Sequence, residues 1–262
     1  MDNDVFNTVT ENKKINGGVD VLDKPERGSV INDTVESVSV FGDTADVSDY
    51  IKRQKTFGYK SYLFFKRTFD IMFSAFILLA FCWLIGLLLL IKWLEDFSNP
   101  VYVSKRVGKN GKVFKFYKIR TMCPKAEEMK EELIKKGLNE ADPPAFKMKN
   151  DPRITKFGKF LRKTSLDEIL QFINVLNGSL SIIGPRSPLP EEVTNYTSYQ
   201  KQRLLVKGGL LCYWQTSPKR HDVKFSDWVE LDLKYIRTQS ILTDIKIFFK
   251  GIFSVLFIRG GE

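Results

Sequence analysis

The chain has 262 residues, 43% of them hydrophobic and 27% charged, which excludes a fibrous or wholly disordered protein. Its net charge of +10 is uneven: residues 1–50 hold eleven acids and four bases, so the remaining 212 residues carry +17. A body this basic predicts an anionic partner such as nucleic acid, phospholipid head groups or a phosphorylated substrate. Three isolated cysteines and one histidine, His221, argue against a disulfide framework, a cysteine-based zinc site and a Ser-His-Asp hydrolase.

Residues 1–50 are predicted to form a disordered acidic tail. They are rich in Asp, Asn, Thr, Ser, Val and Gly, and they show no sustained helical or strand periodicity. Such a segment cannot bury enough apolar area to offset the entropy lost on ordering. It lacks the basic start and apolar run of a signal peptide.

An uncharged run of 21 residues, Ile71 to Ile91, is the strongest shift in composition. As a helix it would span about 30 Å, the thickness of the bilayer hydrocarbon, so we expect residues 51–96 to form a membrane-anchoring segment around a hydrophobic helix, 71–91. Six bases lie in the twenty residues before this run and four in the twenty after it. Basic flanks on both sides favour a re-entrant helix over a single span. The run has no proline, so only Ser74 or Gly86 could help it bend.

Residues 97–262 are predicted to form a small mixed α/β domain. Val101–Val107 and Val113–Ile119 read as strands joined at Lys109-Asn110-Gly111, with Phe114 and Phe116 on one face. A surface helix follows Pro124 and stops at Gly137, and residues 139–157 are expected to form a loop.

Two more helices are predicted towards the C-terminus. One runs over Leu166–Leu176, carries a single apolar stripe and ends at Asn177-Gly178. The other, Ile241–Ile258, is amphipathic, aromatic and basic, and it could pack in the core or lie in a membrane interface.

Asp167-Glu168 are the candidate catalytic residues, and two interpretations of them compete. Ser165 and Glu168 have the spacing of a capping box, which would give both acids a structural role. Alternatively, a helix N-terminus would keep Asp167 ionised as a nucleophile while Glu168 holds a divalent cation against anionic phosphates. The surroundings are strongly basic. They comprise Lys156, Lys159, Arg162, Lys163 and, in a turn after Ile183-Gly184-Pro185, Arg186, which can fork onto phosphate.

Several motifs occur together in one order. They are Lys66-Arg67-x-Phe69-Asp70, Phe116-Tyr117-Lys118-Ile119-Arg120-Thr121-Met122, Leu161-Arg162-Lys163-Thr164-Ser165-Leu166-Asp167-Glu168, Gln171-Phe172-x-Asn174-Val175-Leu176 and Gly184-Pro185-Arg186. Over about residues 60–258 the chain therefore resembles the bacterial monotopic phosphoglycosyl transferases, which initiate capsule, exopolysaccharide or O-antigen synthesis.

The resemblance implies an α+β enzyme with a re-entrant membrane helix, a cytoplasmic catalytic domain at the bacterial plasma membrane and amphipathic interfacial helices. It implies transfer of a phosphosugar from a UDP-sugar to undecaprenyl phosphate with release of UMP, through a phosphosugar intermediate on Asp167. Glu168 would hold Mg²⁺ or assist the second step. Four bases would bind phosphates, namely Arg162, Arg186, Lys118 and Arg120. Phospholipid would surround the protein, and no nucleic-acid partner is implied.

The chain departs from the family pattern in two places. The family's helix commonly bends at a Ser-Pro pair, and Cys82-Trp83 stand there in this sequence. The family's Pro-Gly-Ile-Thr-Gly-Trp-Ala-Gln segment reads Gly208 to Gln215 here, and only Gly209 and Gln215 keep their places. One alternative from another class stays open, a non-catalytic membrane-anchored basic protein that binds anionic lipid or nucleic acid. The sequence leaves the donor sugar, the polysaccharide product and the oligomeric state undetermined.

Overall fold

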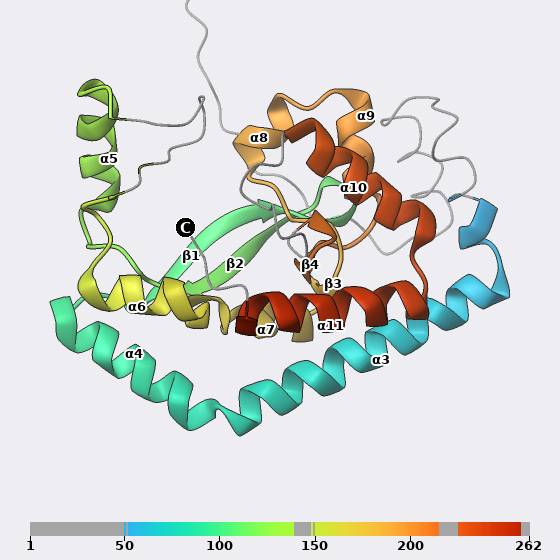
Figure 1. The fold of residues 1–262 in the computed structure, drawn as a ribbon, viewed down its shortest axis with the longest axis horizontal. Coiled ribbons are helices and arrows are strands. Elements are labelled where there is room, and N and C mark those ends of the chain that lie inside the picture. The colour runs from blue at the N-terminus through green and yellow to red at the C-terminus, as the bar shows by residue number, and fades with distance from the viewer. Residues whose placement is uncertain (1–49, 51, 139–147, 149, 215–224, 258–262) are drawn as a thin grey trace, which may run out of the picture.

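The structure is a computed structural model that describes residues 50, 52–138, 148, 150–214 and 225–257. The predicted acidic tail, apart from Tyr50, therefore lies outside the described residues. Figure 1 shows a mixed body of helices and short strands above a long bent helix pair. The elements are α3 (Phe57–Ala80), α4 (Cys82–Asp96), β1 (Val101–Val107), η1 (Lys109–Gly111), β2 (Val113–Ile119), α5 (Ala126–Lys135), α6 (Lys156–Thr164), η2 (Leu166–Glu168), α7 (Gln171–Leu176), β3 (Ser181–Ile183), α8 (Pro190–Thr194), α9 (Ser198–Lys201), η3 (Gln202–Leu205), β4 (Gly209–Leu211), α10 (Phe225–Thr238) and α11 (Ile241–Phe257).

The predicted hairpin is confirmed. β1 and β2 pair antiparallel, with Val101 opposite Ile119 and Val107 opposite Val113. The turn needs left-handed backbone, and Asn110 (φ 57°) and Gly111 (φ 76°) supply it. This register brings Arg106, Phe114 and Lys118 to the same face of the hairpin, because directly paired residues share a face.

A second, parallel sheet of β3 and β4 lies in the main core, where α11 and α3 pack against it. The two strands approach each other closely at Gly184 and Gly209. A side chain at residue 209 would not fit there, since its Cβ would lie 2.0 Å from the Gly184 nitrogen. Half of the buried residues of this core come from β3, η3 and α10. They are Ile182, Ile183, Leu204, Leu205, Val229, Leu233, Tyr235 and Ile236.

A smaller core cluster joins α4 to the segment around Asp167. It buries Leu88 of α4 against Ile119, Leu161, Ile169 and Leu170. Burial of one such side chain stabilises the fold by about 1.5–3 kcal/mol. The contact fixes α4 beneath the segment that carries Asp167.

The apolar run folds as two helices rather than one. α3 and α4 meet at Phe81 with a bend of 62°. Within the described residues no single helix is long and apolar enough to cross a bilayer, whereas this bent pair meets that length and composition together. The expectation that Ser74 or Gly86 would provide the bend is wrong, because both lie inside regular helix. The break falls directly before Cys82-Trp83.

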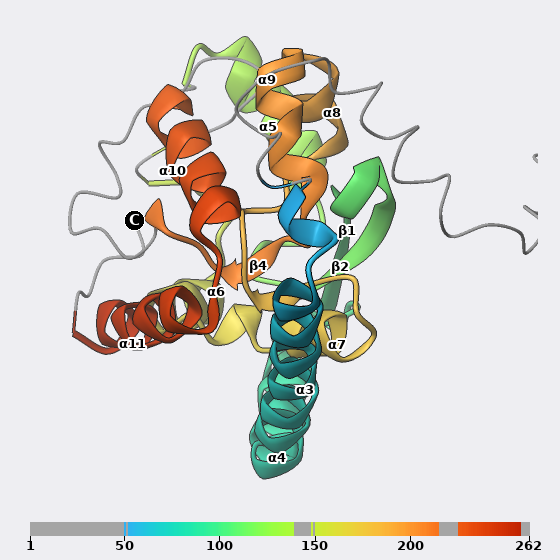
Figure 2. The ribbon, with the colours of Figure 1, turned by 90° about the vertical axis from the view of Figure 1, so that its right-hand side faces the viewer.

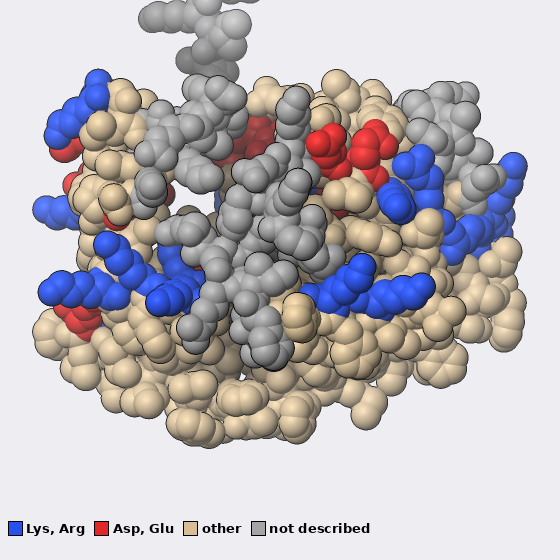
Figure 3. Space-filling model, viewed as in Figure 1, with Lys and Arg blue, Asp and Glu red and all other residues tan. Residues whose placement is uncertain are grey.

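The bent pair and α11 expose large apolar side chains. They include Phe65, Phe69, Met72, Phe76, Leu79, Trp83, Leu87, Leu90, Trp93, Leu94, Leu242, Phe249 and Phe253. In Figure 2 α3 and α4 extend below the body as a narrow ridge, with α11 beside it. Figure 3 shows this lower edge almost free of charged side chains, with a band of Lys and Arg above it.

Two predicted elements need correction, and two more are confirmed. The loop 139–157 is wrong at its end, since α6 begins at Lys156; most of its remainder lies outside the described residues. The helix Leu166–Leu176 is divided into η2 and α7. The surface helix after Pro124 and the C-terminal helix are confirmed as α5 and, within the described residues, α11.

Candidate active site

The Asp167-Glu168 pair is positioned by two consecutive helix ends. α6 begins at Lys156 and is capped by Thr155, whose hydroxyl accepts a hydrogen bond from the Gly158 nitrogen at 3.0 Å. It stops at Ser165, which has left-handed backbone (φ 57°, ψ 16°) and donates its N–H to the Arg162 carbonyl. Left-handed backbone at a non-glycine residue is uncommon and is found where the surrounding structure enforces it. This kink turns the chain sharply, so that η2 presents both acids.

The capping-box interpretation is wrong. Ser165 makes no side-chain capping hydrogen bond to η2. The Glu168 carboxylate does not reach back to residue 165 but accepts a hydrogen bond from Lys118 Nζ at 2.7 Å. The acids are therefore not explained by helix capping.

Asp167 is buried, with 7% of its surface exposed. Its Oδ2 lies 3.7 Å from Lys118 Nζ. Burial, reinforced by the negative charge of Glu168, raises the pKa of Asp167 to about 6, although Lys118 and Arg162 oppose the shift. Asp167 lies in η2, which is only three residues long, so the structure gives it no long helix N-terminus; Lys118 and Arg162 are the groups that favour its ionised form.

Glu168 differs from its neighbour, because its side chain is 46% exposed. Surrounding protein atoms alone would raise its pKa, but Lys118, Gln171 and Arg186 together hold the pKa of Glu168 below its usual range. The site therefore pairs an accessible carboxyl whose pKa is lowered with a buried one whose pKa is raised to about 6.

Three of the four predicted phosphate-binding bases gather around these acids. Lys118 comes from β2 and contacts both carboxylates. Arg162 comes from α6, donates Nε–H to Thr121 Oγ1 at 3.0 Å and stabilises the Asp167 anion. Arg186 follows β3 and stabilises the Glu168 anion. Three separate elements thus converge on one small region.

Arg120 is not part of this group. Its Nε donates to the Asn99 carbonyl at 2.7 Å and its Nη2 to Asp96 Oδ1 at 2.5 Å. Both contacts lie at the end of α4 and just beyond it. The structure thus gives Arg120 a role in attaching α4 to β2.

Arg106 is a basic residue at the site that sequence reasoning missed. Its Nη1 donates to the Ser187 carbonyl at 3.1 Å, and its guanidinium lies over the Phe116 ring, 5.3 Å from the centroid. Burial and the neighbouring charge of Arg186 lower the pKa of Arg106. The alternation of side chains along the strands could have predicted this position. Arg106 pairs with Phe114 and therefore lies on the same face of the hairpin as Phe116 and Lys118.

The protein alone offers few ligands for a metal ion. Among the described residues there is no group of three or more His, Cys, Asp or Glu side chains placed to hold one. The carboxylates of Asp167 and Glu168 are hard oxygen ligands, and Mg²⁺ is commonly bound by one or two carboxylates together with substrate phosphates and water. These residues therefore suit a magnesium ion that binds with a diphosphate substrate.

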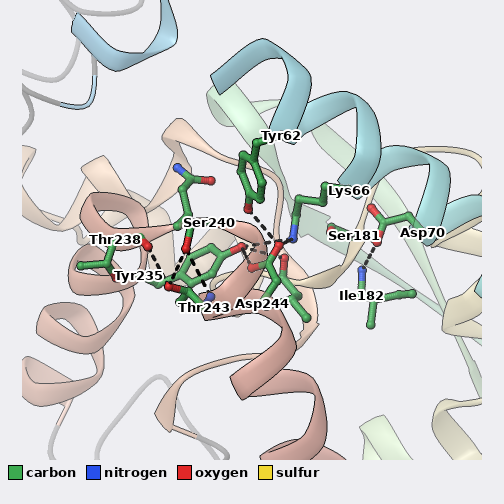
Figure 4. Close-up of polar contacts among 12 residues, drawn as sticks. Tyr62, Lys66, Asp70, Ser181, Ile182, Tyr235, Thr238, Ser240, Thr243 and Asp244 are labelled. Carbon is green, nitrogen blue, oxygen red and sulfur yellow. Dashed lines mark hydrogen bonds and ion pairs between the residues drawn. The ribbon is translucent and has the colours of Figure 1, made fainter. Parts of the chain in front are cut away.

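The Lys66-Arg67-x-Phe69-Asp70 motif fixes α3 to α11, α7 and β3, and Figure 4 shows the contacts of Lys66 and Asp70. Lys66 Nζ pairs with Asp244 of α11 at 2.7 Å. Arg67 donates to the carbonyls of residues 175 and 176 at 2.6 and 2.7 Å, at the end of α7. Asp70 accepts hydrogen bonds from Ser181 Oγ and the Ile182 nitrogen at the start of β3. α3 is thereby attached to the elements that follow Asp167 and precede Arg186.

Comparison with known proteins finds clear similarity over most of the chain. A family model described as bacterial sugar transferase matches residues 61–258. "Galactosyl transferase CpsE" of Streptococcus agalactiae is 38% identical over 247 residues, which are 90% of this chain and 53% of that protein. "Undecaprenyl-phosphate galactose phosphotransferase" of Salmonella typhimurium is 38% identical over 76% of this chain and 42% of its own length.

A shorter relative is covered almost completely. "Exopolysaccharide production protein ExoY" of Rhizobium meliloti is 36% identical over 74% of this chain and 87% of its own length. The chain thus spans about half or less of the two longer relatives but nearly all of this one.

Proposed function

This chain belongs to the bacterial sugar transferase family, and from that premise we propose that it transfers a sugar phosphate from a UDP-sugar to undecaprenyl phosphate and releases UMP. The reaction would be an initiating step of exopolysaccharide, capsule or O-antigen synthesis. Relatives named for undecaprenyl-phosphate galactose transfer and exopolysaccharide production support this substrate class.

One observation carries the proposal. A buried carboxyl, Asp167, lies within reach of Lys118 and under the influence of Arg162, while Arg186 and Arg106 extend the positive region past Glu168. Phosphoryl transfer depends mainly on positioning and on stabilising charge at the transferred group. A carboxylate that is surrounded by cations and kept from water fits a nucleophile towards phosphorus better than it fits a structural acid.

The proposed chemistry has two displacements. Asp167 attacks the β-phosphorus of the donor, the bond between that phosphorus and the bridging oxygen breaks, and UMP leaves with the electron pair. A phosphate oxygen of undecaprenyl phosphate then attacks the phosphorus of the aspartyl phosphosugar, and the Asp167 carboxylate is released. Splitting the transfer through a covalent intermediate replaces one difficult step with two easier ones.

The remaining residues bind and orient the substrates. Lys118 spans both carboxylates, so it can move from neutralising them to contacting the transferred phosphate. Arg162 and Arg186 can each fork onto phosphate oxygens. Magnesium, held by Glu168 and the donor phosphates, would supply positive charge to the leaving group.

A membrane location is part of the proposal. Exposed apolar side chains are numerous on α3, α4 and α11, and the lower edge of the molecule in Figure 3 is almost free of charged side chains. The ribbon in Figure 1 places the strands and the other helices above α3 and α4. We place this lower edge in the inner leaflet of the plasma membrane, with both ends of the bent pair on the cytoplasmic side. Tags at residues 5 and 262 should then both resist labelling in intact cells, and labelling of the N-terminal tag would refute the re-entrant arrangement.

The catalytic test is UMP release from a panel of UDP-sugars in the presence of Mg²⁺ and undecaprenyl phosphate. Asp167→Asn should abolish release with every donor. Asp227→Asn, which changes an exposed acid on α10, is the matched control and should retain full activity. Mass analysis of the wild type with donor alone should find a phosphosugar on Asp167.

The non-catalytic alternative predicts a different pattern. A membrane-anchored binding protein would release no UMP with any donor, and Asp167→Asn would behave like Asp227→Asn. Turnover that persists in Asp167→Asn would keep the enzyme but reject the proposed nucleophile.

A further inference from the structure

A cavity lies away from Asp167, between the start of α3, the β1–β2 turn and the segment before β4. Its volume is about 260 Å³. Its lining is rich in hydroxyl, amide and cationic groups. The charged residues in that lining are Lys66, Arg67, Lys109 and Lys207, against the single carboxylate of Asp70.

Three of these five charged groups form hydrogen bonds or ion pairs within the protein. Lys66 Nζ is paired with Asp244, and Asp70 accepts from Ser181 and Ile182, as Figure 4 shows. The guanidinium of Arg67 donates hydrogen bonds to two backbone carbonyls of α7. The ammonium groups of Lys109 and Lys207, by contrast, form no hydrogen bond or ion pair with any residue that the structure describes.

The ammonium group of Lys207 lies close to the guanidinium of Arg67, and Lys109 lines the same cavity. A methyl group added at Gly178 would lie 3.3 Å from Arg67 Nη2 and 3.5 Å from Lys207 Nζ, so both head groups reach the same point. Burial and the charges of Arg67 and Lys109 lower the pKa of Lys207, and Asp70 offsets only part of this effect. Like charges held together in a partly buried cavity are stabilised by a bound anion.

The cavity is separate from the catalytic site. Lys118 lies near one end of β2, and Lys109 belongs to the turn that precedes the other end. A strand of seven residues is about 20 Å long. A ligand that bridges Lys109 and Lys207 therefore does not contact Asp167.

The position of the cavity identifies the class of anion. Arg67 lies four residues before Ile71, where the uncharged run begins, and four helical residues rise about 6 Å. In the membrane orientation of the proposed function, on which this step rests, the cavity lies at the level of the phospholipid head groups. Lysine ammonium groups act there as compact charges suited to phosphate.

We propose that the cavity formed by Arg67, Lys109 and Lys207 binds the phosphate of an anionic membrane phospholipid. The bound head group neutralises the two unmatched lysines and holds the hairpin turn against α3. Since α3 also contacts the elements around Asp167, the lipid stabilises the orientation of the whole catalytic body on the membrane.

The test is binding of short-chain phosphatidylglycerol to the full-length protein in neutral detergent, followed by native mass spectrometry. The double variant Lys109→Gln/Lys207→Gln should bind about tenfold more weakly, as expected for loss of charge-assisted hydrogen bonds. The matched control is Lys135→Gln/Lys136→Gln, which removes the same charge from an exposed region at the end of α5 and should bind as the wild type does. Lys109→Gln alone, in the exposed turn, tests the site without changing a partly buried residue.

Equal binding by the two double variants would overturn the proposal. Displacement of phosphatidylglycerol by inorganic phosphate, or by a short polyprenyl phosphate, at equal concentration would overturn the assignment to phospholipid. Asp167→Asn should keep full lipid affinity. A failure of the proposed catalytic function is therefore distinguishable from a failure of this site.

Discussion

The pH dependence of the proposed transfer follows from the Asp167 carboxyl, which must be ionised to attack phosphorus. Its pKa of about 6 is set by burial and by Glu168. About nine in ten molecules then carry the nucleophilic anion at pH 7, and about one in ten at pH 5. We expect kcat/KM for UMP release to be half-maximal near pH 6 and to fall about tenfold for each pH unit below it.

Lys118→Met tests the physical cause of this profile. Lys118 is the cation that most favours the Asp167 anion, with its Nζ 3.7 Å from Oδ2. Removing it makes ionisation harder, so the half-maximal pH should move upward, by about one pH unit, equivalent to about 1.4 kcal/mol. The maximal rate should also fall because a phosphate ligand is lost, but the position of the profile is a separate readout.

Arg120→Met is the matched control. It removes a positive charge two residues further along the chain, yet that charge is bound to Asp96 and not to the catalytic acids. Its half-maximal pH should equal that of the wild type. A wild-type profile centred near pH 4, or equal profiles for the two variants, would refute the argument from burial and from Lys118.

Two further predictions concern stability and are measured by denaturant unfolding. Gly158→Ala should destabilise the protein by about 2–3 kcal/mol, because the new methyl group would lie 1.9 Å from the backbone oxygen of Thr121. Gly58→Ala is its control: open space surrounds that position, so the change should be neutral or stabilise the protein by about 0.5 kcal/mol. Arg203→Met should cost about 3–5 kcal/mol by stranding Asp232, whose Oδ2 lies 2.6 Å from Nη2 in a pair 3% and 1% exposed. Arg237→Met, in an exposed pair, should cost less than about 1 kcal/mol. Similar losses within either pair of variants would contradict these assignments.

Local signals in the sequence were sufficient for the hairpin. Its strands alternate, and its turn contains the asparagine and glycine that adopt left-handed backbone, so the bounds of both strands were predicted correctly. The C-terminal helix was equally clear from its periodicity, although the sequence left open whether it packs in the core. The structure answers in part, since Ile247 is 2% exposed while Phe249 is 65% exposed. One face of α11 packs inward and the other is free for an apolar environment.

The fold of residues 156–168 could not be derived from local signals. Residues 156–164 carry apolar side chains at Phe157, Phe160 and Leu161, a helical spacing that was obscured by the surrounding bases. Because α6 was missed, Ser165 was interpreted as the start of a helix rather than the end of one. The left-handed kink at Ser165 depends on packing of the apolar side chains of α6 and α7 in one cluster, which no short sequence window contains.

The bend at Phe81 has no proline or glycine at the break to explain it, and its cause lies at the two ends of the helix pair. At one end, Lys66, Arg67 and Asp70 fix α3 to α11, α7 and β3. At the other end, the side chain of Lys92 is completely buried between Glu95 and Thr155. The same body therefore holds both ends of the uncharged run.

A straight helix could not satisfy both attachments. Two helices of 24 and 15 residues in one line would extend about 60 Å, and α4 would leave the core cluster that buries Leu88. Bending costs the regular hydrogen bonds of about one turn, whereas separating α4 would expose its apolar contacts and break its contacts with Thr155 and Arg120. Some of the flanking bases that first suggested a re-entrant helix thus act as structural anchors. They favour that topology directly, since they tie both ends of the apolar segment to one side of the molecule.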